Sequence, residues 1–488
     1  MTIHTETPRT SWSEPIPEDT VADPVFAKVK SVLSVATLIL MMVWVTVKAS
    51  QLSNPDTWFH LSLGHEFNAG WSLSDPGRLS KFATSPWLPT QWSTEVLAAR
   101  VEDWVGLPGV AWLFGAFILV FLLAVFFLCR REGELLAAAV ATSFTVIAAY
   151  PSLSARPQVV SLILFAVTVG AWRSAVRKRI PPWWLIPLTW VWATAHGLWT
   201  AGVLVGVATC VGMVLDRQVT RRNAMTFLAV PALSVLAACL TPVGPRLLTT
   251  QFAVGARTPL IEEWGPTSFR SMPALAAALM VAAVVVLWSR GDRMRWTPLL
   301  HLLLAGGWIL LVTRMVGFGA VLVAPLFVAA VSEVVTQRGD RRSRGERAGV
   351  WGGVLACLIG LALAVPQSAS APDQVPARFA PRLEALPDGA AVLVEDGTGA
   401  WIEYAFPSLN PSIDGMLDAY PVDYIEAFNG FRELEPGWTD FVRRSGAEVA
   451  VLEQGSPVAA AFEDQLGWTM LQRDSAWVYL SAPTVEPK

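Results

Sequence analysis

Long uninterrupted apolar runs follow one another along the chain from residue 31 to residue 366. An α-helix rises about 1.5 Å per residue, so about 20 apolar residues cross the ~30 Å hydrocarbon core of a bilayer. The fifth and sixth runs are short, and a re-entrant pair is an alternative for them. The pattern predicts eleven transmembrane helices, near 31–49, 108–129, 134–150, 157–173, 183–196, 199–215, 224–240, 273–289, 297–313, 316–335 and 349–366.

Lys and Arg cluster in alternate loops between these runs, which indicates the orientation of the chain. Cytoplasmic loops carry an excess of basic residues, and a miscount of one helix would move the later clusters to the outside. With the amino terminus inside, the outer segments are 50–107, 241–272 and everything after 366. The inner clusters are Arg130 and Arg131, Arg173 to Arg179, Arg217 to Arg222, Arg290 to Arg295, and Arg338 to Arg347.

The two ends of the chain are polar. Residues 1–30 are acidic and contain several prolines, which predicts a disordered cytoplasmic tail. In residues 367–488 the apolar runs shorten to strand length, near 390–395, 410–414, 448–453, 468–473 and 477–481. Helix-like stretches near 397–405, 421–431, 436–445 and 456–466 alternate with them. The fold class expected is therefore a polytopic α-helical membrane protein with a small extracytoplasmic C-terminal α/β domain.

Composition agrees with a membrane protein and excludes few functions by itself. Of the 488 residues 53% are hydrophobic, and the mean hydropathy is +0.46. The formal net charge of -3 gives no sign of a nucleic-acid partner. Cys129, Cys210, Cys239 and Cys357 lie in or at the end of apolar runs, so neither a disulfide framework nor a zinc site is predicted. In the C-terminal segment Glu395, Asp396, Asp414 and Asp418 are interpreted as turn and cap residues, with substrate contact as the alternative.

The first outer loop carries the clearest candidate chemistry, in "NPDTWFH". A helix is expected from Thr57, with Asn54 or Asp56 as its cap, and it places His60 one turn from Asp56. Asp56 either caps this helix or acts as a general base at the membrane surface. A divalent cation shared by Asp56 and His60 is conceivable, although two residues are too few to argue for one.

Other polar residues are expected near the outer membrane boundary. Charges at this depth are costly, which favours a functional role. Two arginines on the outer side run against the positive-inside trend, and they suit an anionic head group such as a phosphate, with harmless snorkelling as the alternative. The histidine is either a packed helix-end residue or part of the site. These candidates are Arg156, Arg314, His196, Glu262 and Glu263.

The order of short motifs resembles a bacterial family of GT-C-type membrane proteins, distantly similar to the oligosaccharyltransferase catalytic subunit and to polyprenyl-phosphate-sugar glycosyltransferases. The motifs are "DTWFHLSLG", "PTQWSTEVLAA", "ARPQ", "WATAHG", "LTPVGPRLL", "IEEWGP", "VTRMVGFGAVLVAPL" and "IDGMLDAY". In that superfamily the loop after the first transmembrane helix carries a catalytic aspartate, which the resemblance assigns to Asp56. Thr57, Thr194 and Met315 depart from the residues that relatives often have at these positions.

The expected function is a plasma-membrane glycosyltransferase that moves a sugar from a polyprenyl-phosphate donor to an extracytoplasmic glycan, lipid or protein acceptor. Asp56 is the expected base and His60 its helper. Arg156 and Arg314 are expected to bind the phosphate, and His196, Glu262 and Glu263 to contact substrate. Two alternatives remain open: a transporter or flippase for a lipid-linked glycan, and a non-catalytic envelope scaffold. No cofactor is assigned beyond the conceivable divalent cation.

Overall fold

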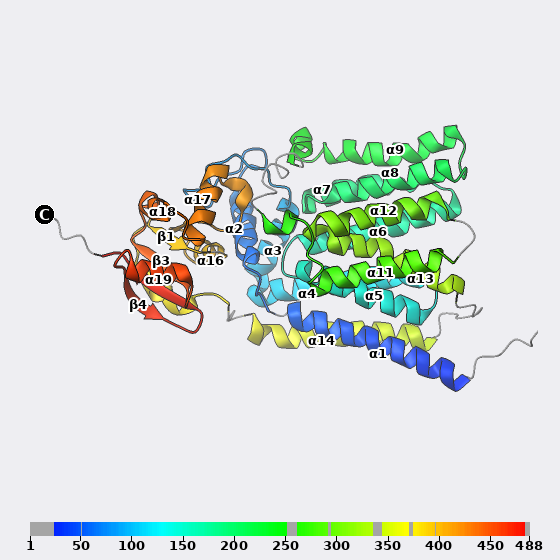
Figure 1. Cartoon of the computed structure of the whole chain (residues 1–488), viewed down its shortest axis with the longest axis horizontal. Helices are drawn as coiled ribbons and strands as arrows, with labels where there is room; N and C mark the ends of the chain where they lie inside the picture. The colour runs from blue at the N-terminus through cyan, green and yellow to red at the C-terminus, as the bar shows by residue number, and fades with distance from the viewer. Residues whose placement is uncertain are drawn as a thin grey trace, which may run out of the picture.

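The computed structural model describes residues 24–49, 51–250, 261–290, 294–334, 344–369, 374–395 and 397–483. It consists of a bundle of long helices with a small domain around a β-sheet at one end (Figure 1). Two shorter helices, α2 and α3, lie between the bundle and this domain (Figure 1).

Each of the eleven apolar runs forms a helix. The first helix begins at Pro24, seven residues before the predicted start, so the predicted tail of residues 1–30 was too long at its C-terminal end. Residues 1–23 lie outside the described part of the chain. The helices are α1 (Pro24–Ala49), α4 (Leu107–Arg130), α5 (Leu135–Ala149), α6 (Gln158–Lys178), α7 (Leu185–Ala195), α8 (Trp199–Leu215), α9 (Arg221–Ala238), α11 (Met272–Trp288), α12 (Trp296–Leu311), α13 (Val316–Val334) and α14 (Arg344–Ser368).

Length and hydropathy place ten of these eleven helices in two groups, and α9 belongs to neither. Within the described ranges, six helices are long and apolar enough to cross a membrane: α1, α4, α5, α6, α13 and α14, some of them extended by an adjoining turn. Helices α7, α8, α11 and α12 are apolar but shorter. The 11 residues of α7 rise only about 17 Å, well short of a bilayer core. The chain is a membrane protein by these helices, while the count of eleven crossings stays a prediction.

Small residues let the central helix α13 approach its neighbours closely. A Cβ atom on Gly319 would stand 2.5 Å from the Ile309 side chain and 2.9 Å from the Ala305 carbonyl oxygen of α12. A Cβ on Gly317 would stand 3.1 Å from Ala149 of α5. Since van der Waals contact between backbones is a main source of helix association in lipid, these glycines fix α13 between α5 and α12. Arg314, just before α13, is thereby held in position.

The helix ends next to the predicted basic loops lie at the end of the bundle away from the sheet domain (Figure 1). Arg130 Nε donates to Glu346 Oε1 at 2.9 Å, and Arg173 Nη2 lies 2.7 Å from Glu132 Oε2. Asp216, at the end of α8, accepts hydrogen bonds from the backbone N–H groups at the start of α12. Among the described residues, helix ends predicted to share one side of the membrane therefore lie at one end of the bundle. Which side of the membrane that end faces stays a prediction.

The predicted outer loop 50–107 folds into two helices that cross at close range. Helix α2 (Asp56–Ala69) was expected to start at Thr57, and α3 (Trp92–Val105) was not predicted. A Cβ on Gly64 of α2 would stand 2.2 Å from the Glu95 carbonyl oxygen and 2.8 Å from Ala99 Cβ on α3. Any larger residue at Gly64 would push the helices apart, so this glycine sets where the Glu95 side chain lies relative to α2.

The C-terminal domain is an α/β unit built on one mixed sheet. Its five strands have the order β2-β1-β3-β5-β4, with β1 parallel to β2 and β3, and β5 antiparallel to β3 and β4. The five strands and the four helices between them have bounds within two residues of the predicted stretches, except that β2 ends three residues earlier than predicted. The elements are β1 (Ala391–Val394), α16 (Thr398–Ala405), β2 (Asn410–Pro411), α17 (Val422–Arg432), α18 (Trp438–Ser445), β3 (Val449–Glu453), α19 (Pro457–Asp464), β4 (Thr469–Arg473) and β5 (Trp477–Ser481).

This domain is joined to the outer loop by specific contacts. Ser80 Oγ donates to the Pro411 carbonyl at 3.0 Å, and the Ser85 N–H donates to the Ala419 carbonyl at 2.9 Å. A Cβ on Gly397 would stand 2.1 Å from Pro55 Cβ, immediately before α2. The domain therefore packs against the start of α2, where Asp56 lies.

Candidate active site

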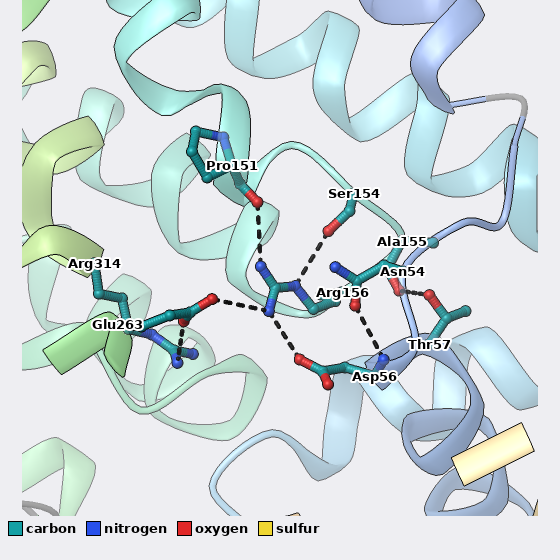
Figure 2. Close-up of polar contacts among 9 residues, drawn as sticks. All are labelled: Asn54, Asp56, Thr57, Pro151, Ser154, Ala155, Arg156, Glu263 and Arg314. Atoms are coloured by element: carbon teal, nitrogen blue, oxygen red, sulfur yellow. Dashed lines mark hydrogen bonds and ion pairs between the residues drawn. The ribbon is translucent and has the colours of Figure 1, made fainter. Parts of the chain in front are cut away.

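Asp56 is the first residue of α2, but its carboxylate does not cap the helix. Asn54 takes that role, because its Oδ1 accepts the Asp56 N–H at 3.0 Å and its carbonyl accepts the Thr57 N–H at 3.1 Å. The partial positive charge of the helix N-terminus favours a carboxylate in this first turn. The Asp56 side chain retains 33% of its exposure and is directed toward Arg156 (Figure 2).

Arg156 binds Asp56 and is fixed from three sides. Its Nη1 donates to Asp56 Oδ2 at 2.8 Å, its Nε to Ser154 Oγ at 3.1 Å and its Nη2 to the Pro151 carbonyl at 3.2 Å. These contacts fold the short loop before α6 around the guanidinium (Figure 2). With only 7% of its surface exposed, Arg156 does not extend to solvent as a snorkelling arginine would. A planar, bidentate donor held in this way is suited to an oxyanion.

Glu263 lies between the two arginines. Arg314 Nη1 donates to Glu263 Oε2 at 3.0 Å, and Arg156 Nη1 lies 3.8 Å from Glu263 Oε1 (Figure 2). The Arg314 guanidinium also lies 5.5 Å from the ring centroid of Trp264, within cation–π range. Asp56, Arg156, Glu263 and Arg314 thus form a row of alternating charge, brought together from segments up to 258 residues apart.

His60 lies one turn beyond Asp56 on α2, and its bonded partner is Glu95 of α3. His60 Nδ1 lies 2.8 Å from Glu95 Oε1, and both side chains are buried. Burial lowers the pKa of His60 well below its usual value, and the nearby Arg156 and Arg314 lower it further. Burial raises the pKa of Glu95 to about 8. At neutral pH the pair is mainly uncharged, so Glu95 carries a proton that it can donate in a hydrogen bond.

His196 ends α7 and is held by its neighbours on α6 and α8. Trp192 Nε1 donates to Ser161 Oγ at 2.6 Å, and Ser161 Oγ lies 2.9 Å from His196 Nδ1. The Leu198 N–H also donates to His196 Nδ1, at 3.3 Å. Because Nδ1 accepts a backbone N–H, the proton of the neutral imidazole resides on Nε2. His196 can therefore donate a hydrogen bond from that atom.

One cavity of about 440 Å³ brings these residues together. Every predicted site residue whose side chain the structure describes lines it, and the Glu262 side chain lies outside the described part. The C-terminal domain contributes the segment from Gly415 to Asp418. Gly415 has φ +91°, and a Cβ on it would stand 3.3 Å from Asp56 Oδ1. The predicted site residues in the lining are Asp56, His60, Arg156, His196, Glu263 and Arg314.

Several lining residues were not predicted, among them Glu95, Gln158 and Trp264. Each lies inside a motif quoted above. Glu95 is followed by the small and apolar residues of "VLAA", which indicates a helix face that is buried. Asp414 acts as a turn residue, because its Oδ1 accepts the Met416 N–H at 2.7 Å. Glu395 instead accepts the N–H of Glu453 in β3, and Asp418 lines the cavity.

The residues around Asp56 do not fit a divalent cation in this arrangement. Within the described ranges no three His, Cys, Asp or Glu side chains gather closely enough to hold a metal ion. The nearby carboxylates of Asp56 and Glu263 are both engaged by arginine, and two guanidinium groups would repel a cation.

Comparison with known proteins identifies the fold. No family model matches the chain, and no curated protein matches it. The solved structures that resemble it show the fold, which is that of the oligosaccharyltransferase AglB.

The solved structures are archaeal and bacterial enzymes of low sequence identity. The chain is similar to the oligosaccharyltransferase AglB from Archaeoglobus fulgidus in complex with an inhibitory peptide and a dolichol-phosphate, at TM-score 0.53 and 11% identity over 95% of this chain and 75% of that one. It is similar to the apo Archaeoglobus fulgidus oligosaccharyltransferase at TM-score 0.56 and 11% identity, over 88% and 70% of the two chains. ArnT from Cupriavidus metallidurans bound to undecaprenyl phosphate aligns at TM-score 0.45 and 14% identity, over 96% and 100%.

Proposed function

We propose that this protein transfers a sugar from a polyprenyl-phosphate-linked donor to a hydroxyl-bearing acceptor at the surface of the membrane. One observation carries the proposal: the row Asp56, Arg156, Glu263 and Arg314 lies in a cavity at the end of an apolar helix bundle. The row combines two partly exposed carboxylates with two cations. These are the groups required to deprotonate an acceptor and to neutralise a departing phosphate.

Arg156 and Arg314 are the proposed phosphate ligands. Glu263 already bridges them, 3.0 Å from Arg314 and 3.8 Å from Arg156, so their guanidinium groups are spaced for a single oxyanion between them. A phosphate would replace this carboxylate, whose side chain is 45% exposed and thus able to move aside. The lipid tail of such a donor would extend along the apolar helices.

Asp56 is the proposed general base. It accepts the proton of the acceptor hydroxyl as the acceptor oxygen bonds to the anomeric carbon of the donor sugar. The bond from that carbon to the phosphate oxygen breaks, and the electron pair leaves with the polyprenyl phosphate. Arg156 and Arg314 stabilise the negative charge that develops on this leaving group. Oδ2 of Asp56 is held by Arg156, so Oδ1 is the oxygen proposed to receive the proton.

The proposed donor determines the location of the protein. Lipid-linked sugars are consumed where their head groups meet water, and the cavity is lined by residues of the bundle, of α2 and α3, and of the C-terminal domain. With the basic loops at the opposite end facing the cytoplasm, the cavity faces outward from the plasma membrane. The acceptor is then a glycan, lipid or protein of the cell envelope.

The direct test is transfer by the purified full-length protein in lipid nanodiscs. A panel of undecaprenyl-phosphate-linked sugars would be incubated with envelope extracts, and release of undecaprenyl phosphate would be measured. We expect release from at least one donor and no release when Asp56 is replaced by Asn. Binding of the donors without any release by the wild type would favour a carrier over a transferase.

A further inference from the structure

Four buried side chains form the floor of the cavity and carry no net charge in their prevailing state at neutral pH. His60, Glu95, Gln158 and His196 are 7%, 2%, 2% and 4% exposed, whereas the carboxylates of Asp56 and Glu263 are 33% and 45% exposed. The floor is therefore polar and uncharged, whereas the row of Asp56, Arg156, Glu263 and Arg314 is charged. The floor offers hydrogen bonds to a ligand but no opposite charge to an ionic one.

Several floor atoms have unused hydrogen-bonding capacity. Gln158 Oε1, Gln158 Nε2 and Glu95 Oε2 are buried and have no hydrogen-bond partner among the described residues. Leaving one buried polar group unpaired costs about 1–3 kcal/mol, so three in one cavity lining call for an explanation. A ligand that both donates and accepts hydrogen bonds would satisfy all three.

The arrangement of the floor is fixed by packing. Gln158 begins α6, and Ser161, three residues on along the same helix face, is hydrogen-bonded to His196. Gly64 holds α3 so close to α2 that Glu95 meets His60. These constraints orient the groups before any ligand arrives, which is the requirement for selective recognition.

We propose that His60, Glu95, Gln158 and His196 form a subsite for the uncharged, hydroxyl-bearing ring of the donor sugar. The inference rests on the proposed function and adds the class of sugar. Hydroxyl groups pair with the Gln158 amide, the Glu95 carboxyl and the His196 Nε2–H. A sugar carboxylate would lose its hydration in this buried floor, whose four side chains include neither Lys nor Arg to compensate it, so we expect uronic acids to bind more weakly.

The test compares lipids that differ only in their head group. Wild-type protein in nanodiscs is titrated with undecaprenyl phosphate, with undecaprenyl-phosphate-linked glucose, galactose and mannose, and with the corresponding glucuronate. At least one neutral sugar lipid should bind ten times or more tightly than undecaprenyl phosphate, and at least ten times more tightly than the glucuronate. Equal binding of neutral and acidic sugar lipids would overturn the subsite.

The second part of the test uses the variant Gln158→Leu. This variant should bind the preferred sugar lipid at least tenfold more weakly than the wild type, while its affinity for undecaprenyl phosphate should stay within twofold of the wild-type value. Gln218→Leu is the matched control, because Gln218 also has a buried unpaired carbonyl but lies at the other end of the bundle. Unchanged sugar-lipid binding in Gln158→Leu, or equal loss for both lipids, would contradict the subsite alone. Failure of the wild type to bind any of these lipids would instead refute the proposed donor.

Discussion

Arg156 Nη1 lies 2.8 Å from Asp56 Oδ2, so the proposed phosphate ligand and the proposed base are each other's partner in the donor-free protein. A phosphate that binds Arg156 competes with Asp56 for the same guanidinium. Donor binding would therefore weaken the ion pair between Arg156 and Asp56, and the Asp56 carboxylate would become available to accept a proton. Arg156 thus couples phosphate binding to proton abstraction in the proposed reaction.

Replacing Arg156 by Gln should weaken binding of undecaprenyl phosphate at least tenfold, because the amide cannot offer a charged fork to an oxyanion. Arg156→Lys keeps the charge but cannot hold Asp56, Ser154 and Pro151 together, so an intermediate affinity is expected. The measurement is the binding of undecaprenyl phosphate to the protein in nanodiscs. Arg100→Gln is the control, because Arg100 is an exposed residue of α3. Wild-type affinity in both Arg156 variants would remove the arginine from the phosphate site.

Glu263→Gln should have the opposite effect. The carboxylate occupies the space between Arg156 and Arg314, where it competes with a phosphate. Removing its charge should strengthen undecaprenyl phosphate binding several-fold, in the same titration as above. Weaker binding would show that Glu263 contributes to the phosphate site and does not compete for it.

The orientation of the chain can be tested with single cysteines. Ser475, exposed in the C-terminal domain, and Ser289, exposed after α11 at the opposite end, would each be changed to Cys in a Cys239→Ser background. The other native cysteines are buried. The Arg and Lys distribution predicts that an impermeant thiol reagent labels Ser475→Cys in intact cells and Ser289→Cys only after lysis. The reverse pattern would invert the topology and place the cavity in the cytoplasm.

The sequence was sufficient for the local structure and for part of the site. Apolar runs of helix length located eleven helices, because burial in lipid or in the bundle requires continuous apolar surface. The start of α1 at Pro24 was missed, since the polar residues before 31 continue the helix without belonging to an apolar run. Asp56 and Arg156 were each identified, but their ion pair was not, because it joins positions 100 residues apart.

The floor of the cavity was harder to predict. Gln158 resembles an ordinary polar residue at a helix start, and only the fold buries it beside His196 and Glu95. The contribution of Gly415 to the lining depends on how the C-terminal domain packs on α2, for which the sequence has no periodic signal. Such contacts depend on tertiary structure, which hydrophobic patterns do not encode.

Glu95 should make the stability of the protein depend on pH. Its pKa rises from 4.5 in the unfolded reference to about 8 in the folded protein, so the folded state binds a proton that the unfolded state has released. The stabilisation is fully present below pH 4.5 and is lost as the pH rises through about 8. For this one group the free energy of unfolding changes by at most about 1.4 kcal/mol per pH unit.

Glu95→Gln should remove this pH dependence. Glu463→Gln, which changes an exposed residue, should leave it in place. Thermal unfolding in nanodiscs between pH 5 and 8.5 would compare the three proteins.

Asp56→Asn is the most discriminating substitution for the proposed chemistry. The Asn54 side chain accepts the Asp56 N–H and shapes the start of α2, so the helix should form normally with Asn at position 56. The amide can still accept a hydrogen bond from Arg156, yet it cannot take a proton from an acceptor hydroxyl. Loss of a general base typically removes two to four orders of magnitude in rate, about 3–5 kcal/mol of barrier.

The control for this change is Asp75→Asn, which alters an exposed aspartate in the same outer loop. Sugar transfer and undecaprenyl phosphate binding would be measured for both variants beside the wild type. Because Arg156 would lose a competing carboxylate, Asp56→Asn should bind the lipid phosphate at least as well as the wild type while transferring almost no sugar. Normal transfer by Asp56→Asn would contradict the role of Asp56 as base. Equal loss of binding and transfer would mean that the carboxylate organises the arginines and does not accept the proton.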